Sequence, residues 1–215
     1  MNTDAGISGS YGKINYNSGV KFIASGGHPS NDGHKYDFRL RTATASVSFP
    51  LSQKWRFSFR TAIDAREFSA KRFYTISPHD SARESVICWW NHVNTIHVGK
   101  RSVSVIDLAM KRNRDEYVFN SLTPPNKHNT SQITAHVTNR MEINSRISLT
   151  TGIQSYYRSV VSNDRGDHSE ISGGIYGIGY ISFPDKINVS GGMRIEFDPF
   201  HSPDLLPQLN FSYSS

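Results

Sequence analysis

Residues 55–66 alternate between apolar and polar side chains, and this alternation constrains the fold more than any other feature of the sequence. The apolar side chains at the odd positions are Trp55, Phe57, Phe59, Ile63 and Ala65. Because successive side chains of a strand point to opposite faces, the segment predicts a strand with one apolar and one polar side. Residues 43–49 repeat the alternation before a short turn that contains Pro50, and the two segments together predict an antiparallel hairpin.

The alternation recurs along the whole chain and predicts an all-β fold of about 11 antiparallel, up-and-down strands. Between residues 84 and 117 apolar side chains compete at both parities, and a β-bulge would reconcile the two registers. Alternate connections of a meander lie at the same end, so one rim is predicted to carry tight turns and the other longer loops. The short connections are expected near residues 17, 52, 99, 144 and 185, and the longer ones near residues 30, 77, 125, 165 and 201.

Two kinds of β fold fit this pattern, because a soluble β-sandwich or lipocalin-like barrel also alternates and contains hairpins. Long strands, the alternating connections and charged side chains at mid-strand favour a transmembrane barrel, whose lumen tolerates those charges. No apolar run is long enough for a transmembrane helix. The mean hydropathy of −0.49 does not argue against a barrel, since only alternate residues of its strands face lipid. An odd number of strands would leave two unpaired edges, so we expect part of a larger barrel.

The charge and the histidines exclude several classes of partner. The formal net charge is +6 and the pI is about 9.5, but the basic residues are spread along the predicted strands, so we expect no nucleic-acid partner. Histidines in the longer loops lack compact ligand spacing, which favours solvated side chains, no metal site and no resident cofactor over a metal, haem or corrinoid contact. These loop histidines are His28, His34, His79, His128, His168 and His201.

Basic and acidic side chains share the polar parity of the predicted strands. They would attract an anionic solute or hold a plug, but pairing with carboxylates on neighbouring strands is the simpler expectation. The arginines are Arg56, Arg60, Arg66, Arg140 and Arg194, and the carboxylates are Asp64, Glu142, Glu196 and Asp198.

Outer-membrane phospholipases combine Ser, His and Asn, and two short stretches were considered for such chemistry. Neither the Asn91-His92 pair nor residues 128–131 carry a recognisable serine motif. We therefore expect that the protein is not an enzyme.

The run from Phe68 to Thr75, Phe-Ser-Ala-Lys-Arg-Phe-Tyr-Thr, resembles a strand end and loop of TonB-dependent outer-membrane receptors. The similar group is the vitamin B12 and siderophore receptor-like type of Bacteroidetes-type bacteria. Residues 30–34, residues 112–117 with the pattern Arg-x-Arg-x-x-Tyr, and residues 206–213 also resemble strand ends or strands of that family. The order of predicted strands and connections is similar over the whole chain, whereas the amino-acid sequence is similar only in these motifs.

The resemblance implies an interior fragment of a barrel of about 22 strands whose lumen is filled by a plug. Residues 1–215 would then form a partial β-barrel domain, with the plug domain and signal peptide absent from the sequence. The implied function is active transport of a large, scarce solute, a corrinoid or iron-siderophore, across the cell outer membrane. The implied partners are outer-membrane lipid and lipopolysaccharide, the plug and TonB complex, and a surface lipoprotein. A passive porin or a soluble β-barrel binding protein is the alternative.

Aromatic and basic side chains at the predicted loop rim are the candidates for ligand binding, because aromatic rings and guanidinium groups can grip a large ligand or a lipopolysaccharide phosphate. They are Arg72, Phe73, Tyr74, His79, Arg112, Arg114 and Tyr117.

Overall fold

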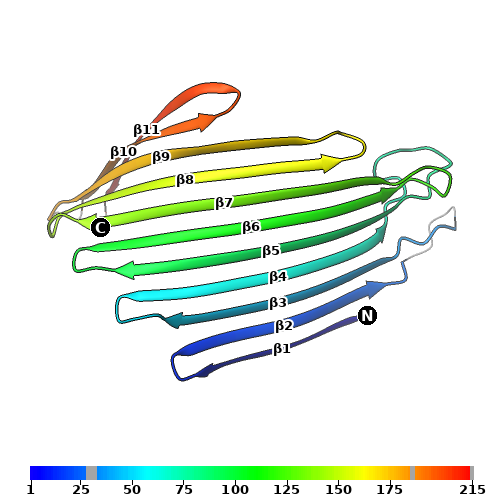
Figure 1. The fold of residues 1–215 in the computed structure, drawn as a ribbon, viewed down its shortest axis with the longest axis horizontal. Helices are drawn as coiled ribbons and strands as arrows, with labels where there is room; N and C mark the ends of the chain where they lie inside the picture. The colour runs from blue at the N-terminus through cyan, green and yellow to red at the C-terminus, as the bar shows by residue number, and fades with distance from the viewer. Residues whose placement is uncertain (28–32, 185–186, 214–215) are drawn as a thin grey trace.

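The computed structural model describes residues 1–27, 33–184 and 187–213, which form one sheet of eleven strands. The strands are β1 (Asn2–Tyr11), β2 (Ile14–Ser25), β3 (Phe38–Pro50), β4 (Trp55–Ser69), β5 (Arg83–Val98), β6 (Ser102–Val118), β7 (Asn126–Glu142), β8 (Ile147–Ser162), β9 (His168–Ser182), β10 (Ile187–Asp198) and β11 (His201–Tyr213). Each strand pairs antiparallel with its neighbours in sequence, so the predicted up-and-down meander is confirmed (Figure 1). Among these residues no helix is long and apolar enough to cross a membrane.

Some of the predicted features fall in the three short gaps of this description. They are His28, residues 30–32 of the motif at residues 30–34, and residues 185 and 186 of the predicted turn near residue 185. Residues 214 and 215 also lie outside the described ranges.

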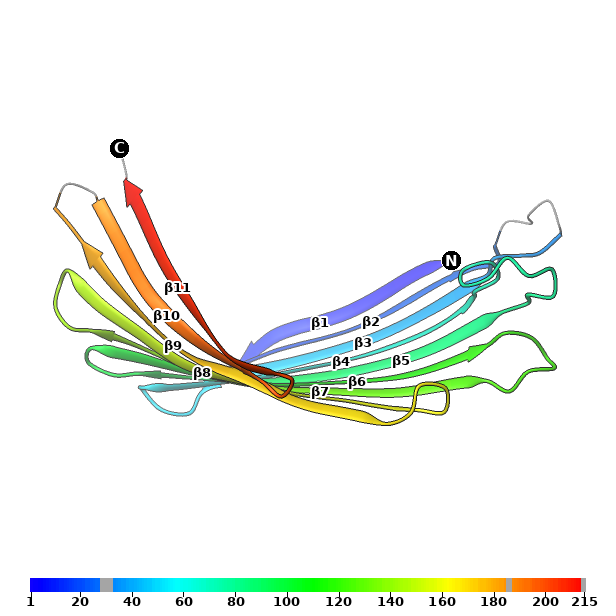
Figure 2. The ribbon, with the colours of Figure 1, turned by 90° about the horizontal axis from the view of Figure 1, so that it is seen from above.

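The sheet is a single curved and twisted layer, and in Figure 2 the edge strands β1 and β11 lie on the same side of the middle strands, so the sheet forms an open trough. The edges are β1 and β11, which do not pair with each other over the described residues. Within the part of the chain that the structure describes, no second sheet packs against either face, which distinguishes this arrangement from a β-sandwich. The chain therefore has a concave and a convex face, and the strand register decides which side chains lie on each.

The convex face is apolar across the sheet. Residues directly opposite each other on paired strands point to the same face, so one row can be followed from β3 to β11. That row runs through Phe49, Phe57, Thr95, Ile106, Val137, Ile153, Ile175, Ile195 and Leu205. Ile153 is 61% exposed and Val137 is 45% exposed. An apolar surface of this extent suits contact with lipid.

The concave face is polar and is held by hydrogen bonds between neighbouring strands. Asp107 of β6 accepts from Asn94 at 2.8 Å and lies 2.9 Å from Nε2 of His92, both on β5. The hydroxyl of Tyr176 on β9 lies 3.0 Å from Nε2 of His136 on β7. The Tyr176 side chain reaches His136 by crossing over Gly152 of the intervening strand β8. Such cross-strand networks satisfy polar groups that line the inside of a curved sheet.

Two of the arginines predicted to pair across strands pair differently on the concave face. Arg66 pairs with Asp64 at 3.7 Å and Arg194 pairs with Glu196 at 3.3 Å, so each pair joins two residues of one strand rather than of neighbouring strands. Side chains two positions apart share a face, which brings them about as close as cross-strand diagonal neighbours. Arg194 also donates to Gln154 at 3.2 Å, and this contact does cross strands.

Two predicted connections and the predicted bulge are wrong. The first turn lies at residues 12–13 rather than near residue 17, because Gly12 adopts a φ of 60° that suits a two-residue hairpin turn. The connection near residue 201 is short, because residues 199–200 alone join β10 to β11 and Asp198 accepts the N–H of Phe200 at 2.8 Å.

The register from β4 through β6 is regular, so the expected bulge is not there. Strand β5 carries apolar side chains on both faces, with Ile87 and Trp89 on the convex face and Val86 buried on the concave face. An irregular register occurs instead between β10 and β11, at Glu196 and Asp198.

Candidate ligand site at the loop rim

The longer connections, which follow β2, β4, β6 and β8, gather at one end of the sheet that we call the loop rim (Figure 1). Four of the seven predicted ligand-binding residues, Arg72, Phe73, Tyr74 and His79, lie in the connection after β4. The other three belong to β6, close to the same rim. The structure divides these seven residues between different surfaces.

The connection after β4 is closed at its base by backbone hydrogen bonds. The N–H of Ala70 donates to the carbonyl of Ala82 at 2.8 Å, and both alanines are completely buried. Asp80 is 3% exposed, and its carboxylate accepts the N–H groups of Arg72 at 2.7 Å and Ala82 at 2.8 Å. Arg72 has a φ of 64°, in the left-handed region that is unusual for residues other than glycine. The buried carboxylate of Asp80 therefore holds a constrained backbone in place.

Tyr74 joins this connection to β5 and β6. Its hydroxyl donates to Oε2 of the buried Glu84 at 2.7 Å, and its ring meets that of Tyr117 edge to face at 5.1 Å between centroids. The hydrogen bond to Glu84, and burial after it, raise the pKa of Tyr74 to about 12. The Phe73 ring lies 6.3 Å from the Tyr74 ring. The structure thus brings together the three aromatic residues of the predicted ligand-binding set.

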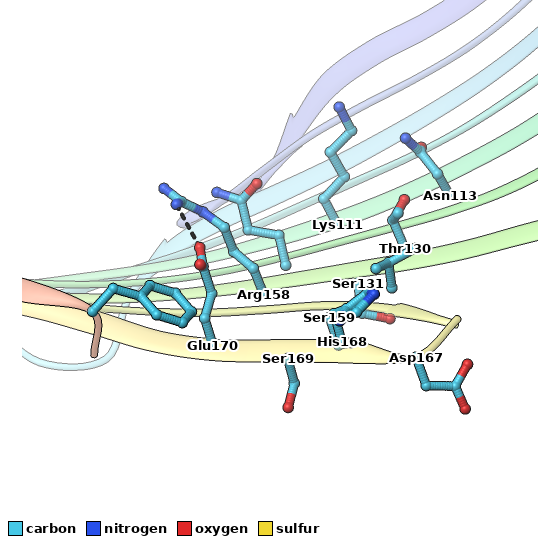
Figure 3. Close-up of a pocket in the computed structure, with 13 residues that line it drawn as sticks. Lys111, Asn113, Thr130, Ser131, Arg158, Ser159, Asp167, His168, Ser169 and Glu170 are labelled. Carbon is cyan, nitrogen blue, oxygen red and sulfur yellow. Dashed lines mark hydrogen bonds and ion pairs between the residues drawn. The ribbon is translucent and has the colours of Figure 1, made fainter. Parts of the chain in front are cut away.

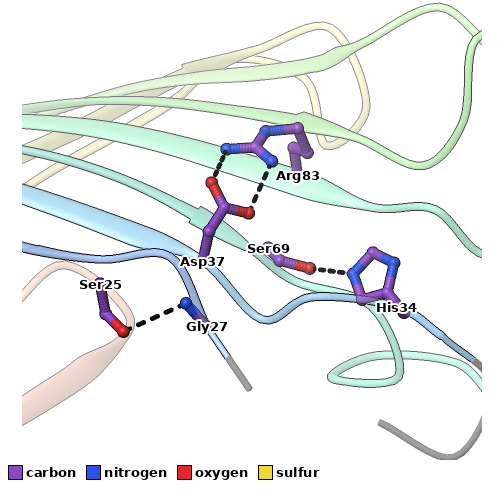
Figure 4. Close-up of polar contacts among 6 residues, drawn as sticks. All are labelled: Ser25, Gly27, His34, Asp37, Ser69 and Arg83. Atoms are coloured by element: carbon purple, nitrogen blue, oxygen red, sulfur yellow. Dashed lines mark hydrogen bonds and ion pairs between the residues drawn. The ribbon is translucent and has the colours of Figure 1, made fainter. Parts of the chain in front are cut away.

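A second set of polar contacts ties the end of the connection after β2 to β4 and β5 (Figure 4). The carboxylate of Asp37 accepts one hydrogen bond from each terminal nitrogen of Arg83, at 3.0 and 3.1 Å. This arrangement is bidentate, and the hydrogen bonds from Arg83 hold the pKa of Asp37 below its usual value. Nε2 of His34 lies 2.6 Å from Oγ of the buried Ser69. The neighbouring connections therefore brace one another.

Next to these contacts the concave face opens into a groove of about 470 Å³, which we call the rim groove. It is lined by aromatic, acidic, basic and amide side chains from β5 to β8 and from two connections. Its lining residues are Tyr74, Glu84, Asn113, Asp115, Tyr117, Asn126, His128, Thr130, Val160, Asp164 and Arg165. The rim groove can therefore offer both ring faces and hydrogen-bonding groups to a large solute.

A larger groove of about 670 Å³, the wall groove, adjoins the rim groove and shares Asn113, Thr130 and Val160 with it. Figure 3 shows Lys111, Asn113 and Arg158 pointing to the concave side, whereas Ser169 points to the opposite face. The remaining lining residues are Ser131, Gln132, Ser159, Asp167, His168, Glu170 and Phe200. The two grooves form one polar surface that descends from the loop rim into the wall.

The wall groove holds two polar groups that the sheet leaves without a partner. The ammonium of Lys111 has no hydrogen bond or ion pair with any described residue, and Oδ1 of Asn113 is buried and unpaired within the same part of the chain. In contrast, Arg158 pairs with Glu170 at 2.9 Å and lies 5.5 Å from the Tyr156 ring centroid. A buried polar atom without a partner is rare, so Oδ1 of Asn113 can accept from a donor of a bound molecule. The exposed ammonium of Lys111 beside it can donate to an acceptor of the same molecule.

Lys111, Asn113 and Arg158 were missed by the sequence analysis, although the signal was present. In β6 the odd positions from 111 to 117 carry polar or aromatic side chains, and these side chains share one face of the strand. The predicted ligand-binding residues of β6 came from both odd and even positions and therefore from both faces. Register with β5 now separates them, because Tyr117 pairs with the concave residue Glu84, whereas Arg112 pairs with Trp89 on the convex face.

Five of the seven predicted residues, among them Phe73, line neither groove. Arg112 and Arg114 belong to the convex face, and His79 is an exposed residue of the connection after β4 whose N–H donates to Ser77 at 3.2 Å. Arg72 contributes its backbone to the base of that connection. Tyr74 and Tyr117 alone of the seven line a groove.

His128, one of the predicted loop histidines, lies in β7 and contacts the last residue of β8. Nδ1 of His128 lies 2.7 Å from Oγ of Ser162, and that oxygen also accepts the N–H groups of Asp164 and Arg165. Because Ser162 is only 7% exposed, its hydroxyl is a turn-stabilising group rather than an accessible nucleophile. Over residues 1–27, 33–184 and 187–213, no three His, Cys, Asp or Glu side chains are grouped as metal ligands.

Sequence comparison identifies no relative of this chain. No protein-family model matches it, and no curated protein matches it in sequence.

Solved structures, in contrast, share its fold. The siderophore receptor PirA of Pseudomonas aeruginosa has a TM-score of 0.76 at 11% identity, over 100% of this chain and 36% of the receptor. A mutant of the ferric enterobactin receptor PfeA from the same organism has a TM-score of 0.77 at 12% identity, over 99% of this chain and 39% of the receptor. The outer-membrane transporter YddB of Escherichia coli has a TM-score of 0.72 at 9% identity, over 97% of this chain and 35% of the transporter. This chain spans little more than a third of the length of these proteins and has the fold of their barrel wall.

Proposed function

We propose that this chain forms about half of the barrel wall of a TonB-dependent transporter in the outer membrane. The division of its sheet into an apolar convex face and a polar concave face carries the proposal, because such a sheet is stable only with lipid outside and a polar interior. The fold shared with siderophore receptors supports the same assignment. The tight turns would then face the periplasm and the loop rim the cell exterior.

The transported solute is proposed to be a large, scarce iron-siderophore, with a corrinoid as the alternative. Solved structures with this fold include receptors for siderophores, which favours the first of the two. The rim groove would receive the solute against the exposed sides of the Tyr74 and Tyr117 rings, and Lys111 of the adjoining wall groove would meet an anionic group of the solute. The concave face below would contact the plug, and the TonB complex would supply the energy for transport.

Sequencing of the DNA on both sides of this reading frame is the first test. Upstream codons for a plug and a TonB-contacting segment, with downstream codons for the remaining strands, are the expected result. Stop codons and unrelated genes on both sides would contradict the transporter and direct attention to the passive porin or the free-standing binding protein.

Solute binding by the restored receptor is the second test. Replacing both Tyr74 and Tyr117 with alanine is expected to weaken binding of a ferric catecholate siderophore by at least about tenfold, since each ring contributes stacking or cation–π contacts. Tyr180→Phe is the matched control, because the Tyr180 side chain lines neither groove. Equal binding by the double variant and the control would show that the solute is held elsewhere.

A further inference from the structure

Arg112 and Arg114 occupy the convex face where β6 approaches the loop rim, which is an unexpected position for two charged side chains. Arg112 lies opposite Trp89 on β5 and Ser131 on β7. Arg114 lies opposite Ile87 and Asn129 on the same two strands. Both arginines are exposed, and neither side chain makes a hydrogen bond or ion pair with any residue of the described chain.

The two guanidinium groups can act on one ligand. Residues two positions apart on a strand share a face and lie about 6.6 Å apart. The nearest carboxylate on this face of β6, Glu116, is paired with Lys127 of β7 at 3.4 Å. Asn129, which faces Arg114, adds a neutral donor beside them. The cluster therefore presents unneutralised positive charge with hydrogen-bond donors around it.

The surroundings change from apolar to polar along the strands at these arginines. Trp89 and Ile63, 45% and 47% exposed, lie in the same register row as Arg112, and Leu108, 48% exposed, lies farther from the rim on β6. On the rim side lie Ser85 and the Lys127–Glu116 pair. A tryptophan at such a boundary, with arginines beside it, is typical of the interface between hydrocarbon and headgroups.

We infer that Arg112 and Arg114 bind the phosphate groups of a phosphorylated glycolipid of the lipopolysaccharide type, whose acyl chains lie against Trp89 and Ile63. This inference rests on the proposed outer-membrane location. Guanidinium groups bind phosphate oxygens through paired hydrogen bonds, and the apolar floor beside them requires a ligand that also carries hydrocarbon. The residues face away from both grooves, so this site is separate from the solute site.

The test measures lipid binding by the full chain inserted into phosphatidylcholine vesicles. Three vesicle preparations are compared: phosphatidylcholine alone, the same lipid with lipopolysaccharide, and the same lipid with dephosphorylated lipopolysaccharide. Bound glycolipid is counted after detergent extraction and native mass spectrometry. The double variant R112Q/R114Q is compared with K21Q, which removes one positive charge from the concave face of β2 outside both grooves, and with R112K/R114K, which keeps the charge.

The wild-type chain is expected to retain lipopolysaccharide about tenfold more strongly than the dephosphorylated lipid. R112Q/R114Q should lose this preference, K21Q should keep it, and R112K/R114K should keep part of it because lysine lacks the planar fork. Equal loss in K21Q would overturn the inference, as would an unchanged R112Q/R114Q. Displacement of the lipid by inorganic phosphate alone would show a free-anion site and would overturn it as well.

The failure of this inference is distinguishable from the failure of the proposed function. Vesicle flotation and a β-type circular dichroism spectrum report insertion before any lipid is counted. A chain that does not insert overturns both proposals. A chain that inserts without distinguishing the two glycolipids overturns the lipid site alone.

Discussion

The hydroxyl of Tyr74 donates a 2.7 Å hydrogen bond to Oε2 of Glu84, and this bond joins the connection after β4 to the second residue of β5. Glu84 is 9% exposed although it is a carboxylate. The phenol therefore serves a buried acceptor, while its ring forms part of the rim groove.

Replacing Tyr74 with phenylalanine is expected to loosen the connection after β4 without unfolding the sheet. The change removes one hydrogen bond to a charged group, and local opening should become between about three- and tenfold more frequent. Hydrogen exchange of the amides of Arg72 and Ala82 measures that opening. Tyr180→Phe is the control, since its hydroxyl has no hydrogen bond with a described residue, and equal exchange in both variants would contradict the role of the Tyr74–Glu84 bond.

Tyr74 should also lose its phenolic proton at a higher pH than an ordinary tyrosine. Its pKa is raised to about 12 from an ordinary value of 10.0, so the hydrogen bond contributes stability in full below the ordinary value and loses that contribution as the pH rises through about 12. An ultraviolet titration of tyrosinate should therefore lose its late component in the Tyr74→Phe variant. Loss of a component near pH 10 would instead show that Glu84 does not influence the phenol.

The Asp37–Arg83 pair is expected to stabilise the loop rim at neutral pH and not in acid. Because Arg83 lowers the pKa of Asp37, the contribution is present above the usual carboxylate value and disappears as the pH falls through the lowered one. The Arg83 side chain is 54% exposed, so a double-mutant cycle with D37N and R83Q should give a coupling of at most about 1 kcal/mol. A coupling that persists at the acid end would refute an ionic origin.

Gly152 is expected to be essential to the Tyr176 network on the concave face. A Cβ at position 152 would collide with the Tyr176 ring, whose hydroxyl lies 3.0 Å from both His136 Nε2 and Thr138 Oγ1. Gly152→Ala should therefore lower the free energy of unfolding by about 1 to 3 kcal/mol.

Gly177 provides the control for this substitution. It lies on the neighbouring strand β9, and a Cβ there meets no atom within 4 Å, so Gly177→Ala should have little effect. Urea titrations of both variants in micelles make the comparison, and equal destabilisation would point to backbone strain common to both strands.

A positive charge should be tolerated on only one face of β7. Val137 lies near the middle of the convex face, whereas Thr134 of the same strand lies on the concave face. Val137→Lys is expected to disfavour membrane insertion by about 2 to 4 kcal/mol, and Thr134→Lys should insert like the wild type. Vesicle flotation measures both, and similar behaviour of the two variants would mean that the convex face does not meet lipid.

Periodicity alone was sufficient to predict the class of fold, because each strand keeps one apolar parity over many residues. The hairpin at Pro50 and the turn at residues 99–101 follow directly from that pattern. The first turn was misplaced because Asn17 and Gly19 resemble turn residues, whereas in the structure they lie on the concave face of β2 opposite Ser46 and Thr44.

The candidate site was predicted only in part, because a motif read as consecutive letters combines two faces of a strand. Tyr117 and Arg114 are three residues apart and lie on opposite sides of the sheet. The partners of Tyr74 could not be predicted either, since its contact with Tyr117 depends on how the connection after β4 folds back over β6. The register with the neighbouring strand shows which face each side chain occupies, and the sequence of a single motif does not contain that information.

The two free edges of the trough have a directional consequence. In a meander of eleven strands the first and last run the same way, so β1 and β11 both descend from the loop rim. A second copy of this chain in the same membrane orientation would meet these edges only through parallel seams. A companion segment that completes the wall with antiparallel pairing throughout must bring an odd number of strands, beginning and ending with one that ascends.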